Sequence, residues 1–325
     1  MTGGTGGGAL PREESPLAES LNGNGVAHPR RESGVTLVLG GGGARGLAHL
    51  GVLRVLEQEG IPVRAVVGNS AGAIMAAAWL QQESAEKAIR HILAFQYSPS
   101  FQRLGLSFHP RRRGDGRPRS FVGRVLSGWR SQVAMHLLFR RASLFHRKRL
   151  EILVGAAVRP GRLEELRLPL HVVALDIASG EQVVLDRGDL RTILTASASV
   201  AGFFPPVEVD GRPLIDSGLA DNLPVVAARE RCGGPIVAVN LSCNLDARFD
   251  CLTGIEALLR SEELASRFNN RQRAELADVR VEPRVGTRYW LDFSEPESIV
   301  AAGEAAARES LAAIRRLVPA PAPAH

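Results

Sequence analysis

The chain has 325 residues, 45% of them apolar, and a formal net charge of +6. This length and composition predict a globular protein with one large α/β domain or two small ones. The longest nearly unbroken apolar stretch, residues 71–80, is too short to span a bilayer, which takes roughly 18 to 20 residues, so we expect no transmembrane helix. The three cysteines show neither a CxxC motif nor paired metal-ligand spacing, which argues against a zinc site or a disulfide framework and fits a reducing cytoplasm.

Residues 1–33 are rich in Gly, Glu, Pro and Ala and lack the layout of a secretory signal. We expect a disordered leader there, a domain over residues 34–318, and a loose tail at 319–325. The predicted location is cytoplasmic, with peripheral contact at the inner face of the membrane.

Strand and helix patterns alternate from residue 35 onward. Strand 35–39 precedes a helix at about 46–59, and strand 63–67 precedes a helix that opens at Ser70. Because these strands are mainly apolar, without alternation of polar and apolar residues, they predict a mainly parallel sheet covered by helices on both faces. Further along the chain we expect helices at about 85–95, 148–158, 189–199, 254–277 and 296–317, strands at 170–175, 182–185, 236–241 and 279–281, and a hairpin at 207–215.

A basic stretch interrupts this pattern. Between Arg103 and Arg149 there are thirteen Arg and Lys residues against one acid, Asp115, so the positive charge is local. A turn-rich piece at 110–118 and an amphipathic helix at 121–137 are expected in it, as an insertion or cap over the sheet. Contact with anionic phospholipid is one interpretation, and a solvated helix packed on the domain is another. Nucleic-acid binding is less favoured, because no aromatic stacking platform accompanies the arginines.

The pentapeptide from Gly68 to Gly72 places Ser70 at a strand-to-helix corner. Such a turn exposes a serine at the sheet edge and requires small neighbours. A glycine-rich helix start capped by Ser70 would use the same residues, but the strand before it and the helix after it favour a nucleophile. We expect neither a metal ion nor a cofactor at this site.

A serine nucleophile needs a base, and downstream of residue 171 the only histidine is His325 in the tail. A carboxylate is the alternative. Asp216 is the best placed, because it follows the short apolar strand 213–215 and precedes Ser217 and Gly218, which let the chain turn. Asp176, at the end of another strand, is the main competitor, and an ordinary Asp-Ser-Gly turn is the structural alternative.

The glycine run Gly40 to Gly43, with Arg45 and Gly46, also matches the GxGxxG pattern of dinucleotide sites. That fingerprint requires an acid at the end of the second strand, where this chain has Gly68-Asn69. A P-loop is excluded too, because Leu47 and Ala48 stand where Lys and Ser or Thr are required. Free backbone N–H groups at a helix start remain, and they suit a developing oxyanion. Arg45 either strengthens the positive field or fixes the loop.

Four segments together resemble the patatin-like phospholipases, in particular their bacterial members. They are GGGGARGLAHLGVL at 40–53, GNSAGA at 68–73, ASVAGFFPPVEVDGRPLIDSGLADNLPV at 198–225 and YWLDFSEPESIVAAGEAA at 289–306. The resemblance implies a three-layer α/β/α fold and a Ser-Asp dyad that hydrolyses acyl esters of lipids without a metal ion. Carried onto this chain, Ser70 is the nucleophile, Asp216 the base, and the Gly41, Gly42 and Gly43 amides the oxyanion hole. Gly46, Gly68, Gly72 and Gly218 fall at glycine positions of the motifs.

One position departs from the family pattern, which usually has Asp-Gly-Gly or Asp-Gly-Ala where this chain has Asp216-Ser217-Gly218. A side chain at 217 is expected to restrict the turn or to form a hydrogen bond with the aspartate. The sequence thus predicts a serine hydrolase of phospholipids or lysophospholipids that meets anionic membranes. The alternatives are a non-catalytic basic module that binds membrane or nucleic acid, and a dinucleotide-binding dehydrogenase.

Overall fold

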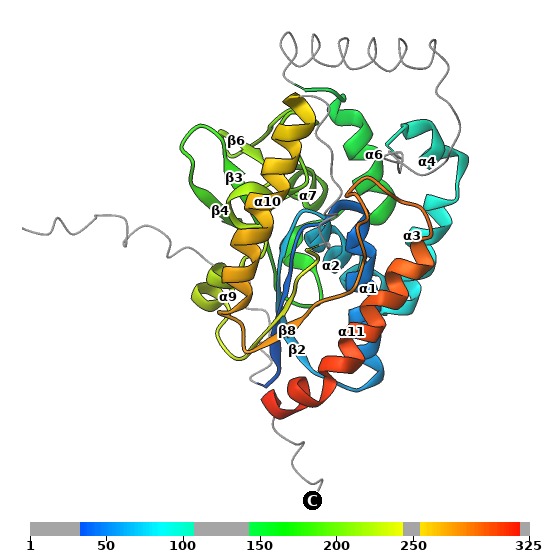
Figure 1. Ribbon diagram of the computed structural model, residues 1–325, viewed down its shortest axis with the longest axis vertical. Coiled ribbons are helices and arrows are strands. Elements are labelled where there is room, and N and C mark those ends of the chain that lie inside the picture. The colour runs from blue at the N-terminus through cyan, green and yellow to red at the C-terminus, as the bar shows by residue number, and fades with distance from the viewer. Residues whose placement is uncertain (1–32, 107–142, 243–253, 319–325) are drawn as a thin grey trace, which may run out of the picture.

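A central sheet lies between two layers of helices in the computed structural model, which describes residues 33–106, 143–242 and 254–318 (Figure 1). The predicted leader and tail lie outside the described residues, and so do the turn at 110–118 and the helix at 121–137. The division into leader, domain, insertion and tail therefore stays a prediction. The predicted α/β/α architecture with a mainly parallel sheet is confirmed.

The strands of the sheet follow the order β5-β6-β3-β2-β1-β7-β8, and β4 also pairs with β3. The β3, β2, β1, β7 and β8 strands run parallel to one another, whereas β4, β6 and β5 add antiparallel pairings at one edge. The strand bounds are β1 Val35–Leu39, β2 Val63–Asn69, β3 Leu170–Asp176, β4 Gln182–Leu185, β5 Val207–Val209, β6 Arg212–Ile215, β7 Ile236–Val239 and β8 Val279–Val281.

The period-two alternation of a strand explains the two helical layers. In β1, Val35, Leu37 and Leu39 join the larger core, which includes residues of α1, α2, α3 and α11. Val38 faces the other way and joins a second core with α9 and the end of α10. Since both faces of β1 are covered, all five of its residues are buried, and an apolar strand without polar alternation is the expected result.

The helices begin and end near the predicted positions. A short 3₁₀ turn, Gly43–Gly46, precedes α1, and a second one lies at Leu163–Glu165. Three helices were not predicted, α4, α8 and α9, and all three are short. The helix bounds are α1 Leu47–Gln58, α2 Ala71–Gln82, α3 Ala85–Gln96, α4 Pro99–Leu104, α6 Arg147–Ala157, α7 Leu190–Ser197, α8 Gly218–Asp221, α9 Val225–Arg231, α10 Gly254–Ala274 and α11 Pro296–Leu317.

The predicted hairpin is formed by β5 and β6. Asp210 and Gly211 connect them with φ values of 51° and 75°, the left-handed conformation that a tight hairpin turn of this kind requires. The pairing of β6 with the end of β3 brings Ile215 beside Leu175. Residue 216 therefore leaves the sheet at the same end as the carboxyl ends of β2 and β3.

Candidate active site

Ser70 lies in a strained corner between β2 and α2. Its φ of 53° and ψ of −124° are unusual for a residue with a side chain, and such strain is often kept at functional sites. Gly72 permits the corner, because a Cβ atom there would stand 2.1 Å from the carbonyl oxygen of Leu39. The Ser70 backbone N–H donates to Ser197 Oγ at 2.8 Å, and Ser197 Oγ donates to the Val173 carbonyl at 2.6 Å. Ser197 thus connects the corner to β3 by two hydrogen bonds.

Asp216 follows β6 and is held by three kinds of contact. Its backbone N–H donates to the Ser199 carbonyl at 3.0 Å. Its Oδ1 accepts the Gly218 N–H at 2.8 Å and the Asn69 Nδ2 amide at 3.2 Å. The side chain of Ser70 also favours the ionised form of this carboxylate. The structure therefore brings together the two residues that the sequence nominated as nucleophile and base.

The electrostatics of Asp216 result from opposing effects. Burial raises the pKa of the carboxyl above its usual range, and the hydrogen bonds from Ser70, Gly218 and Asn69 partly oppose that rise. A carboxylate with a raised pKa is a stronger base than an ordinary aspartate. That property suits a group that must take the proton of a hydroxyl.

Asp176, the competing candidate, is used differently. Its Oδ1 accepts the Ala178 N–H at 2.9 Å, and the hydrogen bond from Ala178 is the main cause that holds its pKa below the usual range, against the effect of burial. It caps the turn after β3 and does not line the cavity that contains Ser70. The geometry supports Asp216 over Asp176.

The glycine loop follows β1 and lines the same cavity as Ser70. The Gly41 N–H donates to the Asn222 carbonyl at 3.1 Å, so this amide is already used. Within the part of the chain that the structure describes, the N–H groups of Gly42 and Gly43 donate to no other group. Of the three amides expected to bind an oxyanion, these two are the available donors. Gly43 has a φ of 57°, and a Cβ there would stand 2.2 Å from the Trp290 carbonyl oxygen, which explains the glycine.

The remaining predicted positions support this loop and the serine corner. Arg45 lines the cavity, and its Nε donates to the Gly42 carbonyl at 3.2 Å, which favours the loop-fixing role of the two considered. Gly46 packs against Ala71, where a Cβ would meet the alanine methyl at 2.6 Å. Gly68 lies in β2 and abuts Ala73.

Sequence reasoning assigned no role to His49, which the structure places beneath the loop. His49 in α1 is fully buried, and its Nε2 lies 2.7 Å from the Gly40 carbonyl oxygen. Burial lowers the pKa of this imidazole from 6.5 to about 4. A neutral ring with its proton on Nε2 donates to Gly40 and holds the start of the glycine loop. The signal in the sequence was the spacing of nine residues from Gly40, which places His49 in the first turn of α1 behind the loop.

Asn69 and Asn222 complete the polar network under the serine. Asn69 Nδ2 donates to Asn222 Oδ1 at 3.2 Å as well as to Asp216, and Asn222 Nδ2 donates to the Gly41 carbonyl at 3.2 Å. This chain of side-chain amides connects the aspartate with the glycine loop. Neither asparagine was predicted to take part, because their contacts join residues about 150 positions apart.

The cavity that contains Ser70 has a volume of about 220 Å³ and two chemically different walls. The α10 helix contributes a polar wall, where burial and the charge of Asp216 raise the pKa of Glu262. Most of the other lining side chains are apolar and form the apolar wall. The apolar lining includes Ile74, Met75, Leu106, Leu150, Leu153, Phe203, Phe204, Trp290, Leu291 and Phe293, and the polar lining on α10 includes Glu262, Glu263, Ser266, Arg267 and Asn270.

Neither a metal-binding cluster nor a membrane-spanning helix occurs in the described ranges. No group of three or more His, Cys, Asp or Glu side chains there is arranged to hold a metal ion. Among the same residues, no helix combines the length and the apolar character that a membrane span requires.

The fold is an α/β/α sandwich, and its site resembles that of a hydrolase. The site combines a serine in a strained strand-to-helix corner with an aspartate partner and a glycine loop. The model of the family described as patatin-like phospholipase matches residues 37–229, more than half of the chain. The chain belongs to this family.

Several known proteins are similar in sequence to part of this chain. The chain is 28% identical over 225 residues to lysophospholipase NTE1 of Kluyveromyces lactis, covering 69% of this chain and 13% of that protein. It is 28% identical over 229 residues to the human patatin-like phospholipase domain-containing protein 6, covering 70% of this chain and 14% of that protein. The chain thus spans a small part of the length of these relatives. The solved structure of VipD from Legionella pneumophila has a TM-score of 0.46 and 16% identity, with 88% of this chain and 67% of that chain covered.

Proposed function

We propose that the chain is a serine lipid acyl hydrolase of the phospholipase A or lysophospholipase type. The observation that carries the proposal is that Ser70 and Asp216 line one cavity together with many apolar side chains, and that the Ser70 side chain favours the ionised form of Asp216. Membership of the patatin-like phospholipase family and the names of relatives such as lysophospholipase NTE1 support an ester-bond hydrolase.

Acylation is the first half of the proposed reaction. Ser70 Oγ attacks the carbonyl carbon of the acyl ester while its proton passes to Asp216. The tetrahedral oxyanion accepts hydrogen bonds from the Gly42 and Gly43 amides, and each such donor stabilises the transition state by about 3 kcal/mol. When the intermediate collapses, the ester C–O bond breaks and the leaving alcohol takes the proton from Asp216. The acyl group then remains on Ser70.

Deacylation repeats these steps with water. Asp216 takes a proton from the water, which attacks the acyl-enzyme carbonyl carbon, and the same amides hold the second oxyanion. Collapse returns the proton to Ser70 Oγ and releases the fatty acid. A carboxylate base with a raised pKa suffices for both proton transfers, so the proposal requires no histidine, metal ion or cofactor.

The walls of the cavity support a lipid substrate. Aliphatic and aromatic side chains such as Ile74, Leu153 and Phe203 suit a fatty acyl chain, and the polar α10 wall suits a head group or glycerol. We include both phospholipids and lysophospholipids in the proposal. A cytoplasmic location with peripheral contact at an anionic membrane also belongs to it, supported by the composition and the local basic charge.

Hydrolysis of a monomeric p-nitrophenyl acyl ester tests the proposal without requiring a membrane. The protein should turn the ester over, and Ser70→Ala should reduce the rate to background while its thermal unfolding stays cooperative. Normal turnover by Ser70→Ala would rule out the serine mechanism. The non-catalytic alternative, a basic binding module on this fold, predicts no turnover by either protein.

A dinucleotide site remains the least supported alternative. The residue at the end of β2 is Asn69, and its amide is committed to Asp216 and Asn222. Saturable binding of NAD to the protein would revive that alternative.

A further inference from the structure

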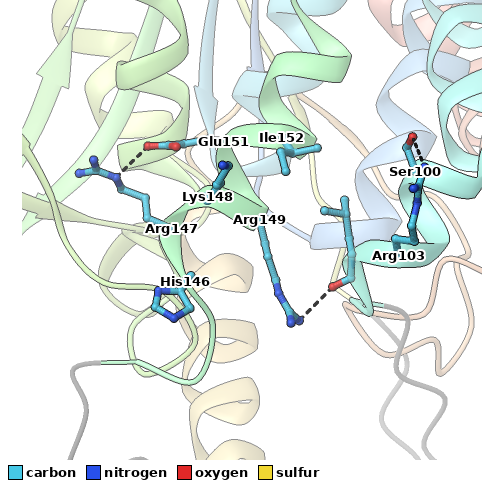
Figure 2. A pocket seen from close by; sticks show the side chains of 9 residues that line it. Ser100, Arg103, His146, Arg147, Lys148, Arg149, Glu151 and Ile152 are labelled. Atoms are coloured by element: carbon cyan, nitrogen blue, oxygen red, sulfur yellow. Dashed lines mark hydrogen bonds and ion pairs between the residues drawn. The ribbon is translucent and has the colours of Figure 1, made fainter.

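A second cavity, which we call the basic groove, lies between α4 and α6. It has a volume of about 730 Å³. Figure 2 shows its side chains coming from two elements, with Ser100 and Arg103 on α4 facing the first turns of α6. The groove is lined by Ser100, Arg103, Leu104, His146, Arg147, Lys148, Arg149, Glu151 and Ile152.

The charge of the basic groove is strongly positive. Among the described residues that line the groove, Arg103, Arg147, Lys148 and Arg149 are accompanied by one carboxylate, that of Glu151. Arg147 Nε pairs with Glu151 Oε1 at 2.8 Å, so one cation is balanced within its own helix. The other three cations leave a local net charge of +3 on the groove, with His146 counted as neutral.

These three cations are positioned without being neutralised. Arg149 Nη1 donates to the Leu104 carbonyl at 3.0 Å, and its guanidinium lies 5.2 Å from the centre of the Phe145 ring. Arg103 Nε donates to the Pro99 carbonyl at 3.3 Å. Within residues 33–106, 143–242 and 254–318, the exposed ammonium group of Lys148 has no hydrogen-bond or ion-pair partner. Carbonyl oxygens and a ring face orient a cation but leave its charge available to an anion.

The basic groove adjoins the catalytic cavity across one helix. Arg149 and Ile152 of α6 line the groove, while Leu150 and Leu153 of the same helix line the cavity that contains Ser70. An α-helix with its side chains is about 10 Å across. A molecule in the groove is therefore separated from the proposed acyl site by roughly the width of α6.

We propose that the basic groove binds the anionic head groups of the phospholipid surface that presents the substrate, an inference that rests on the proposed lipid hydrolase. The groove would hold bilayer lipids that are not hydrolysed, next to the cavity that takes the reacting acyl chain. Phosphate groups complement Arg103, Lys148 and Arg149. Ile152 has 41% of its surface exposed beside them, which suits the boundary between head groups and acyl chains.

Nucleic acid is the less favoured ligand for the same cations. Binding of single strands depends on aromatic side chains on which bases stack. Among the described residues that line the basic groove there is no Phe, Tyr or Trp. The geometry therefore favours a layer of head groups over a polynucleotide.

Vesicle sedimentation of the full chain tests the proposal. Vesicles of phosphatidylcholine alone are compared with vesicles of equal parts phosphatidylcholine and phosphatidylglycerol. The groove variant is the double change Arg103→Gln and Lys148→Gln. Its matched control is Arg280→Gln with Lys87→Gln, which removes the same two residue types from exposed positions on β8 and α3.

We expect the groove variant to bind the anionic vesicles roughly 30-fold more weakly than the unmodified protein, from the usual attraction of two basic residues to an anionic surface. The control should bind within about threefold of the unmodified protein. A charge-preserving variant, Arg103→Lys with Lys148→Arg, should restore most of the binding. Hydrolysis of the monomeric p-nitrophenyl ester should be the same in all four proteins, because the changed residues lie outside the catalytic cavity.

Three results would overturn the basic groove as a lipid site. They are an unmodified protein that does not prefer anionic vesicles, equal binding by the groove variant and its control, and a groove variant that loses oligonucleotide binding but keeps vesicle binding. Failure of the proposed hydrolase is a separate result, in which the unmodified protein shows no ester turnover. The sedimentation comparison does not depend on that turnover.

Discussion

The hydroxyl of Ser217 lies 2.9 Å from Oδ1 of Asn69 and donates to it. The same hydroxyl oxygen is 3.0 Å from the Asp221 carbonyl, and the side chain is fully buried. This contact fixes the Asn69 amide with its nitrogen toward Asp216 Oδ1, at 3.2 Å. Ser217 thus acts on the aspartate through Asn69. A direct hydrogen bond to the aspartate was one of the two effects expected from the sequence, and restriction of the turn was the other. Its hydroxyl replaces the smaller residue usual in the family and adds a constraint to the network.

Loss of the Ser217 hydroxyl should alter the base. In Ser217→Ala, Asn69 is free to turn, and the hydrogen bond that lowers the Asp216 pKa weakens. We expect the acidic limb of the kcat/KM profile to move to higher pH, with kcat a few-fold lower at neutral pH.

Ser199→Ala is the matched control for Ser217→Ala. Its buried hydroxyl donates to the Thr195 carbonyl at 2.8 Å and does not contact Asn69. Stability should fall by about 1 kcal/mol in both variants, as for one buried hydrogen bond, but the acidic limb should move only in Ser217→Ala. A shift of the same size in both would show that Ser217 has no special link to the base.

The two carboxylates at the strand ends should differ sharply in importance. Asp216→Asn removes the proposed base and should lower kcat for a p-nitrophenyl acyl ester by about 10⁴-fold. Asp176→Asn changes a turn outside the catalytic cavity and should keep kcat within a few-fold of the unmodified protein. Steady-state kinetics on both variants decides which aspartate is the base. A larger loss of kcat in Asp176→Asn than in Asp216→Asn would assign the base to Asp176.

The raised pKa of Asp216 also predicts an effect on stability. Because folding disfavours its ionised form, the protein is more stable below the pKa of the unfolded chain and loses that stability as pH rises through the folded pKa. Replacement by Asn removes the ionisation. Asp216→Asn should therefore unfold at a higher temperature than the unmodified protein at pH 7, and this advantage should vanish in acid. If Asp216→Asn were less stable than the unmodified protein at pH 7, and less stable by the same amount in acid, the result would argue against a carboxylate whose ionised form is destabilised by folding.

Strong local patterns made most of the fold predictable. Unbroken apolar strands and small residues at the corners indicated β1, β2, Ser70 and the β5–β6 hairpin, and the strand at 213–215 pointed to Asp216. What the sequence could not reveal are contacts between distant residues, such as Asn69 with Ser217 or the Gly41 amide with the Asn222 carbonyl. These depend on the way β6 pairs with β3, and no spacing rule encodes that pairing. The antiparallel strands at the edge of the sheet arise from the same pairing.

His49 should support the glycine loop through its contact with Gly40. In His49→Leu the Gly40 carbonyl loses its buried donor, at a cost of about 1–3 kcal/mol in stability. The proposed oxyanion donors lie two and three residues further on, so kcat should fall about tenfold while KM changes little. Kinetics and thermal unfolding at neutral pH test this expectation. A KM effect without a kcat effect would place His49 in substrate binding instead.

The same histidine predicts a loss of stability in mild acid. Its folded pKa of about 4 lies below the unfolded 6.5, so the stability present above pH 6.5 is lost as pH falls from 6.5 to about 4. His49→Gln should flatten this part of the stability curve. His91→Gln is the control, since His91 is an exposed residue on α3 whose ring contacts the Ala156 carbonyl at 2.7 Å. Equal curves for His49→Gln and the unmodified protein would show that another group titrates there.

Labelling with a fluorophosphonate, followed by mass spectrometry of the peptides, tests the Ser70–Asp216 pair most directly, because only an activated serine reacts with this reagent. The unmodified protein and Asp176→Asn should take up one label, on Ser70, at similar rates, and Asp216→Asn should react far more slowly. Absence of label on Ser70, or undiminished labelling of Asp216→Asn, would contradict the proposed dyad.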